Sequence, residues 1–430
     1  MKLKVDLKIL TQYIFLYIML MLHGAIYWSN VYDQTFLPIC IIIAAVVFLS
    51  FYFKVSLPDI EFIITMAVFS AFFLLSGILH SKDFINGLDI KPLLFIWANI
   101  IIANLAYKLD RKEAPIRFIR LLSFFAIISL LVYVFCMFGG APVIQNTLPG
   151  FRPTAGTRTY YGKYLFSVLW SIHEQDGYRR NIGIFYEPGV YQIVLNAAIF
   201  IILFCRDAIN EKNKTVNLYL ILFILTVLST GSTTGYLGLA FMFIGFVMQS
   251  SGKNAKTIKI IVVLFVCLIA LDYIKNGEAS LVQNYIFNKF EGTTGDISDM
   301  RGSSGGARMI VFAIAIAAMK KNPLFGIGNT AVELQLEKLW GKRVGAGNIL
   351  CSYIAKKGLA VILIFLTALL RLAWKNKRTV VSFLVFAALY VNTAFAQAQL
   401  AYGVFIFIAM LEKADILNNN LEDEKELEKI

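Results

Sequence analysis

Long apolar runs separated by short polar connectors make up most of the chain. Most of the runs are long enough for a helix to cross a hydrocarbon core of about 30 Å. Within lipid these runs must be helical, because a helix satisfies its own backbone hydrogen bonds there. The pattern predicts about twelve transmembrane helices, at residues 10–28, 35–53, 60–80, 90–107, 118–139, 188–205, 216–230, 233–249, 258–275, 358–374, 379–395 and 398–411.

Composition agrees with this pattern. Of the 430 residues, 58% are hydrophobic and 16% are charged, whereas a soluble domain carries about 25% charged residues to face water. The predicted fold class is therefore an all-α, polytopic integral membrane protein. Residues 1–430 are expected to form a single transmembrane domain.

The distribution of lysine and arginine predicts the orientation. With the N-terminus in the cytoplasm, the cytoplasmic tails and connectors hold 22 of these residues, and the short outer connectors hold only two, Lys82 and Lys91. This asymmetry favours cytoplasmic N- and C-termini. Two large extracytoplasmic loops follow, at 140–187 and 276–357, and residues 412–430 form a cytoplasmic tail.

One apolar stretch inside the second loop is too short to be a span. Met309 to Met319 contains 11 residues between Arg308 and Lys320. It is better interpreted as a helix at the outer membrane surface, or one tucked into the protein. A span here would also move the later basic connectors to the outer side.

The net charge of +13 is spread over connectors and loops, so it favours anionic lipid head groups and anionic lipid-linked substrates over nucleic acid as partners. The three histidines, His23, His80 and His173, have no companions at metal-ligand spacing, and the chain has no Walker A motif. We therefore expect no metal and no cofactor.

The two long outer loops are the best places to look for chemistry, because long loops between packed spans are usually functional. Arg180 lies just before a span, and Arg308 opens the short apolar helix. Each is either an ordinary loop charge or a phosphate ligand at head-group depth. Glu187 has two compatible interpretations: it starts a helix before Pro188, or it accepts a proton from a sugar hydroxyl.

Other polar groups have simpler interpretations. Hydroxyls in the turn at 229–235 are expected to cap backbone groups at membrane depth. Asn392, Gln397 and Gln399 flank the last outer turn. They either join helices or line a polar cavity.

Four motifs together resemble a known family. They are Arg-Asn-Ile-Gly-Ile-Phe-Tyr-Glu-Pro-Gly at 180–189, Ser-Thr-Gly-Ser-Thr-Thr-Gly-Tyr at 229–236, Arg308 with Asn-Pro-Leu-Phe-Gly-Ile-Gly at 322–328, and Gly-Asn at 347–348. Their order, the two outer loops and the number of spans resemble the bacterial repeat-unit polymerases of O-antigen and capsule synthesis (Wzy type), within the O-antigen polymerase and ligase superfamily.

The resemblance implies a metal-independent glycosyltransferase of the bacterial inner membrane. Its partners would be glycan donors and acceptors linked to undecaprenyl pyrophosphate, with a chain-length regulator as a further candidate partner. Glu187, Arg180 and Arg308 are the candidate catalytic residues. The candidate substrate-binding residues are Arg179, Arg301, Arg152, Asn329, Asn348, Gly326 and Gly328.

Two other functions stay open from the sequence. The ligase branch of the superfamily often has a histidine just before the asparagine matched by Asn348, and this chain has Gly347 there. That difference favours polymerase over ligase. A transporter or flippase for anionic lipid-linked solutes would also need many spans, but should carry more charged residues at mid-span.

Overall fold

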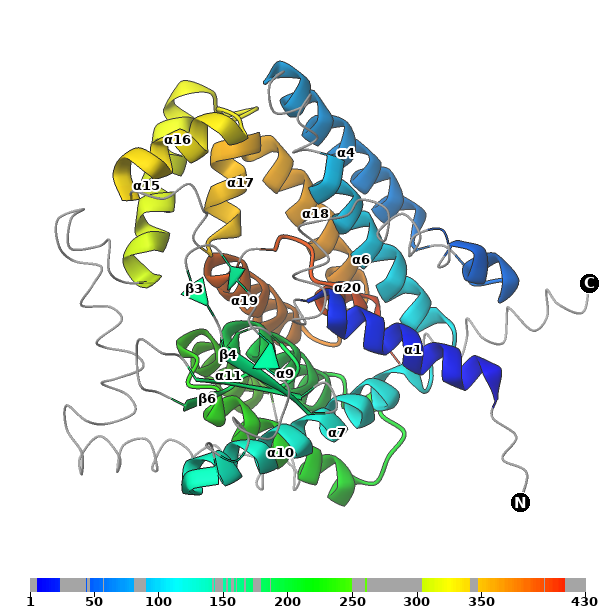
Figure 1. Ribbon diagram of the computed structural model, residues 1–430. Coiled ribbons are helices and arrows are strands. Elements are labelled where there is room, and N and C mark those ends of the chain that lie inside the picture. Colours follow the sequence, from blue (N-terminus) through cyan, green and yellow to red (C-terminus); the bar gives the residue numbers. More distant parts are fainter. Residues whose placement is uncertain are drawn as a thin grey trace, which may run out of the picture.

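Helices form at the predicted apolar runs wherever the computed structural model describes them (Figure 1). The described residues are 6–23, 44, 47–56, 58–80, 90–140, 143, 150–151, 154–155, 158–159, 161–165, 168–172, 179–185, 187–249, 260, 304–340, 347–397 and 399–413. The predicted span at 258–275 lies outside them except for residue 260, and the span at 35–53 is described mainly from residue 47.

Most of the described helices pack together into one main bundle. Its helices are α1 (Leu7–Leu22), α4 (Ile60–Leu79), α6 (Ile90–Lys108), α7 (Ala114–Phe135), α9 (Pro188–Phe204), α10 (Asn213–Ser229), α11 (Thr233–Gln249), α18 (Leu359–Lys375), α19 (Val380–Ala396) and α20 (Gly403–Met410). Three described stretches, Ile60–Leu79, Ile90–Lys108 and Ala114–Gly140, are long and apolar enough to cross a bilayer, and further apolar helices are slightly shorter. The prediction of an all-α membrane protein is confirmed.

Helix α9 lies at the centre of the bundle. All its side chains from Val190 to Phe204 are buried, and it packs against α7, α10, α11, α19 and α20. A helix that is apolar on every side is stable only when neighbours surround it. The N-terminal end of α9 therefore meets other elements of the bundle.

The last helix of the bundle, α20, is much shorter than the predicted span at 398–411. It has eight residues, so it extends only about 12 Å. Asn99 accepts a hydrogen bond from the Gly403 amide at 3.2 Å, and His23 accepts one from the Val404 amide at 3.1 Å. These side chains replace the helical partners that the first amides of α20 lack. Hydropathy alone did not predict this break.

A second, smaller core lies beside the bundle. It joins α15 (Ser304–Lys321), α16 (Asn329–Trp340) and α17 (Ile349–Lys357), which lie together at one end of the molecule (Figure 1). Val311, Leu336 and Ala355 are among its buried residues, and Ile354 contacts both cores. The predicted short helix at 309–319 thus exists, and it packs into the protein between α16 and α17.

Short strands occur in the segment before α9. They are β1 (Gly150–Phe151), β2 (Thr154–Ala155), β3 (Arg158–Thr159), β4 (Tyr161–Leu165), β5 (Val168–Ile172) and β6 (Arg179–Asn181). Strands β1, β4, β5 and β6 form an antiparallel sheet in that order, and β2 pairs with β3. The sequence analysis did not predict these strands.

Candidate active site

The end of β6 is fixed to the bundle by the Arg-Asn-Ile-Gly motif. Arg180 donates hydrogen bonds to the carbonyls of Thr230 at 2.9 Å and Gly231 at 2.6 Å. Asn181 is buried and donates to the hydroxyl of Ser229 at 2.9 Å. Gly183 has a φ of +55°, and a Cβ there would lie 2.6 Å from the ring of Tyr191. The motif therefore holds the chain that leads into α9.

In the turn between α10 and α11, side-chain hydroxyls form hydrogen bonds with backbone groups, as predicted. Thr230 donates its hydroxyl to the Val227 carbonyl at 2.6 Å, and Tyr236 donates to the Leu228 carbonyl at 2.8 Å. The Ser232 amide donates to the Thr230 hydroxyl at 3.3 Å. Backbone groups at this helix end are thus satisfied by side chains, and Arg180 binds two further carbonyls of the same turn.

Glu187 lies directly before α9 in an extended conformation, with φ −148° and ψ 153°, and its side chain makes no capping hydrogen bond to that helix. Its carboxylate interacts electrostatically with Arg308 of α15 and with Tyr402. The helix-start interpretation is correct for the backbone, because the Glu187 carbonyl accepts the Val190 amide at 3.1 Å. The side chain lies near the first turn of α9, where a Cβ on Gly189 would be 3.5 Å from its Oε1 atom.

Arg308 lies between Glu187 and the C-terminal end of α19. It donates a hydrogen bond to the carbonyl of Ala396 at 3.2 Å. Burial lowers the pKa of the Arg308 guanidinium, and the negative charge of Glu187 opposes that shift. Because the ordinary pKa of arginine lies far above neutral, the group stays cationic at neutral pH.

Asn348 completes this region from the start of α17. It is 1% exposed. Its side-chain oxygen accepts the Cys351 amide at 3.2 Å, and its side-chain nitrogen donates to the Arg308 carbonyl at 3.4 Å. The amide of Ile349 donates to the Gln397 carbonyl at 3.0 Å. One asparagine thus starts α17 and joins it to α15.

Two glycines allow these elements to approach closely. A Cβ on Gly347 would lie 2.6 Å from the Ala396 carbonyl oxygen, and a Cβ on Gly189 would collide with the side-chain amide of Gln397. Gln397 is buried. The starts of α9 and α17, the end of α19 and Arg308 of α15 therefore meet at one place, which we call the Glu187–Arg308 site.

The remaining predicted residues are two glycines, one asparagine and three arginines, and most lie away from the Glu187–Arg308 site or outside the described residues. Gly326 and Gly328 have φ values of +69° and +86°, and the amides of residues 327 and 328 donate to carbonyls at the end of α17 at 2.8 and 3.1 Å. Their observed role is in the backbone of a turn. Asn329 lines a separate cavity with Lys356 and Lys357.

Strand β6 includes Arg179, while Arg152 and Arg301 lie outside the described residues. Arg180 and Arg308 are held by different carbonyls, one at the α10–α11 turn and the other at the end of α19. Their joint action on one diphosphate stays a prediction.

Sequence reasoning missed some polar groups near these sites. Tyr402 belongs to a predicted span, and Lys356 and Lys357 were counted only as loop charges. A hydropathy pattern carries no signal that would bring these residues next to Glu187 or Asn329. Their positions depend on the break before α20 and on the turn that ends α17.

Comparison with known proteins adds one finding. Residues 218–366 match the model of a protein family described as O-antigen ligase. The matched segment includes Arg308, Asn329 and Asn348, and Glu187 lies before it. No curated protein matched the chain.

Proposed function

From the match at residues 218–366, which supports the O-antigen polymerase and ligase superfamily, we propose that this protein is a repeat-unit polymerase of the bacterial inner membrane. It would transfer a growing glycan from undecaprenyl pyrophosphate to a sugar hydroxyl of another lipid-linked repeat unit. The product would be O-antigen or capsular polysaccharide.

The observation that carries this proposal is that the start of α9, Arg308 and Asn348 all meet the end of α19 at the Glu187–Arg308 site. Glycosyl transfer from a lipid pyrophosphate needs a cation for the leaving group and a proton acceptor for the attacking hydroxyl. The site places an arginine beside a carboxylate, and Asn348 ties the arginine's backbone to α17.

In the proposed reaction, one bond forms as another breaks, and Arg308 and Glu187 serve the leaving group and the proton. The acceptor hydroxyl oxygen forms a bond to the anomeric carbon of the donor while that carbon's bond to the pyrophosphate oxygen breaks. The electron pair leaves with the lipid pyrophosphate, whose charge Arg308 stabilises. The hydroxyl proton passes to the Glu187 carboxylate and later to water.

The backbone at Gly347 supports a polymerase over a ligase. The ligase branch often has a histidine at this position. Here any Cβ would lie 2.6 Å from a main-chain oxygen, that of Ala396, so a histidine requires the end of α19 to move. Glu187 is the proton acceptor that we propose in its place.

Ligase activity is the second candidate, because the matched family model bears that description. A reconstituted reaction separates the two activities. The purified protein in lipid nanodiscs receives only undecaprenyl-pyrophosphate-linked repeat units. A polymerase yields a ladder of longer lipid-linked glycans.

Products that form only after a lipid A-core acceptor is added would instead establish a ligase. Cells that lack the protein provide the matching test. A polymerase mutant loses the ladder above one repeat unit and still decorates lipid with single units. Loss of all decorated lipid would contradict the polymerase proposal.

A further inference from the structure

A second polar cavity lies between the bundle and the small core of α15, α16 and α17. Its volume is about 130 Å³, and it is lined by Phe73, Pro92, Asn329, Glu333, Tyr353, Lys356 and Lys357. A cavity of this size has room for several water molecules or for a hydrated phosphate group.

The charged groups of the cavity favour an anion. Lys356 and Lys357 come from the last turn of α17, and Glu333 from α16 is the one acidic residue of the lining. Lys357 is 2% exposed, and its ammonium lies 4.9 Å from the ring centroid of Phe73. Among the residues that line the cavity, the two lysines therefore outnumber the one carboxylate, and Lys357 is desolvated.

The backbone around the cavity adds a further attraction for anions. Asn329 is the first residue of α16, and the Val332 amide donates to the Gly328 carbonyl at 3.2 Å. The N-terminus of a helix carries partial positive charge and binds phosphates readily. The rings of Phe73 and Tyr353, which also line the cavity, contact each other with centroids 5.8 Å apart.

The position of the cavity matches the depth of lipid head groups. Phe73 lies in the last two turns of α4, and Pro92 lies in the first turn of α6. The connector between these helices is predicted to be extracytoplasmic. The cavity is thus at the membrane boundary on the side where we expect lipid-linked glycans.

The cavity is separate from the Glu187–Arg308 site. Asn348 stands at one end of α17 and Lys357 at the other, and nine residues of helix extend about 13 Å. A rigid helix therefore holds two cationic places at a fixed distance. Repeat-unit polymerisation needs two lipid pyrophosphates at once, one on the donor and one on the acceptor.

We propose that the Lys356–Lys357 cavity binds the pyrophosphate of the acceptor lipid while the Glu187–Arg308 site binds that of the donor. This assignment rests on the proposed polymerase function. A simpler role exists for the lysines, since cations at a helix C-terminus complement its dipole. That role predicts an effect on stability and none on acceptor binding.

The test measures how many molecules of undecaprenyl pyrophosphate the full-length protein holds, by native mass spectrometry from nanodiscs. Wild-type protein should hold two. Lys356→Gln and Lys356→Gln/Lys357→Met should each hold one, and Arg308→Gln should also hold one. Met preserves the apolar stem of Lys357, and Lys356→Gln alone leaves the buried position unchanged. Lys338→Gln, on the exposed end of α16, is the matched control and should hold two.

Kinetics provide the second readout. Loss of a charge-assisted contact should raise the acceptor KM by roughly 10- to 100-fold with little change in kcat, and Lys356→Arg should restore it. Two bound lipids in the lysine variants, or one in wild-type protein, would overturn the proposal. Displacement of the second lipid by excess phosphatidylglycerol would overturn it too, since the cavity would then bind any phospholipid. Absence of bound lipid in wild-type protein would contradict the polymerase function itself.

Discussion

At the scale of single residues, Glu187 begins a helix and is also electrostatically coupled to Arg308. Its backbone begins α9, its side chain makes no capping hydrogen bond to that helix, and its negative charge acts on Arg308 and Tyr402. A residue that only complemented the helix dipole would contribute about 1 kcal/mol or less. The proposed catalytic role predicts a much larger effect.

Replacement of Glu187 by glutamine should therefore slow chain growth about 100- to 10,000-fold, the usual contribution of a general base. The amide keeps the size of the side chain and removes the proton acceptor. The assay is polymerisation of purified lipid-linked repeat units by variant protein of wild-type abundance and melting temperature. Near-normal turnover would leave Arg308 without a catalytic carboxylate and would refute this role.

Some individual residues of the candidate site could be predicted from the sequence, but which residues lie together could not. Glu187 and Arg308 were selected because each opens a predicted helix, and both lie at the same place in the structure. Gly326 and Gly328 were selected by motif, and their observed role is a turn with positive φ. Lys356 and Lys357 were not predicted as site residues, because a cavity formed by helices distant in sequence leaves no local sequence pattern.

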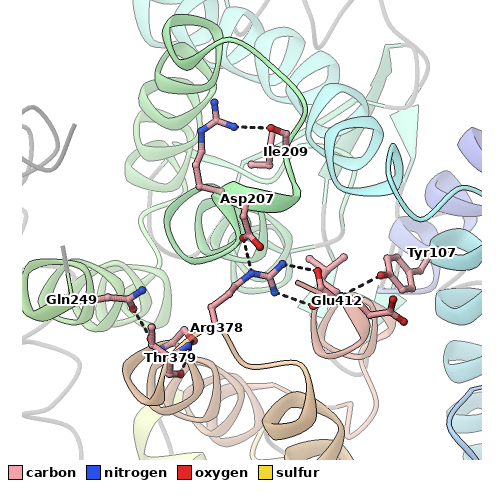
Figure 2. Close-up of polar contacts among 10 residues, drawn as sticks. Tyr107, Asp207, Ile209, Gln249, Arg378, Thr379 and Glu412 are labelled. Carbon is pink, nitrogen blue, oxygen red and sulfur yellow. Dashed lines mark hydrogen bonds and ion pairs between the residues drawn. The ribbon is translucent and has the colours of Figure 1, made fainter. Parts of the chain in front are cut away.

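At the scale of elements, one arginine holds several helix ends together (Figure 2). Arg378, in the connector between α18 and α19, donates to the Asp207 carboxylate at 2.8 Å and to the carbonyls of Leu411 and Glu412 at 2.8 and 2.9 Å. The Glu412 amide in turn donates to the Tyr107 hydroxyl at 3.1 Å. The connector is thereby joined to α6, to the segment after α9 and to the end of α20.

Arg378→Ala should lower the free energy of unfolding by about 2–3 kcal/mol, because it removes charge-assisted hydrogen bonds in a place where the arginine side chain is only 11% exposed. The matched control is Arg371→Ala in the same basic cluster. Its ion pair with Glu61 has side chains 63% and 56% exposed and should contribute about 1 kcal/mol or less. Thermal melting in detergent compares the two. Equal effects would mean that Arg378 acts only as a surface charge.

Helix positions followed from the sequence where hydropathy alone decides them. The runs at 216–230 and 233–249 correspond to Asn213–Ser229 and Thr233–Gln249. The run at 398–411 predicted a full span, whereas the structure contains only the eight residues of α20. That helix start depends on Asn99 and His23 from distant helices, and local hydropathy does not contain this information.

At the scale of the whole molecule, the Glu187–Arg308 site and the Lys356–Lys357 cavity both involve α17, which belongs to the second core (Figure 1). Arg378 and Glu412 lie at the other end of α18 and α20, near the end of α6. The distribution of basic residues predicts that this second end is cytoplasmic, and the orientation stays a prediction.

The orientation can be measured with topology reporters. Fusions after Asp176 and after Thr293 should both report the extracytoplasmic side, because each position lies in a predicted outer loop. Fusions after Lys108 and Lys377 should report the cytoplasm and serve as internal controls. A cytoplasmic signal from either loop position would exclude the arrangement with about twelve spans.

The break before α20 also affects how the protein is made. A helix of about 12 Å cannot cross a core of about 30 Å alone, and its first amides need the side chains of Asn99 and His23. The C-terminal segment therefore enters the bilayer as a stable element only after α1 and α6 have been inserted and packed. Chain order meets this requirement, since His23 and Asn99, whose side chains accept these hydrogen bonds, precede α20 in the sequence. We therefore expect α20 to become ordered only inside a bundle that already contains α1 and α6.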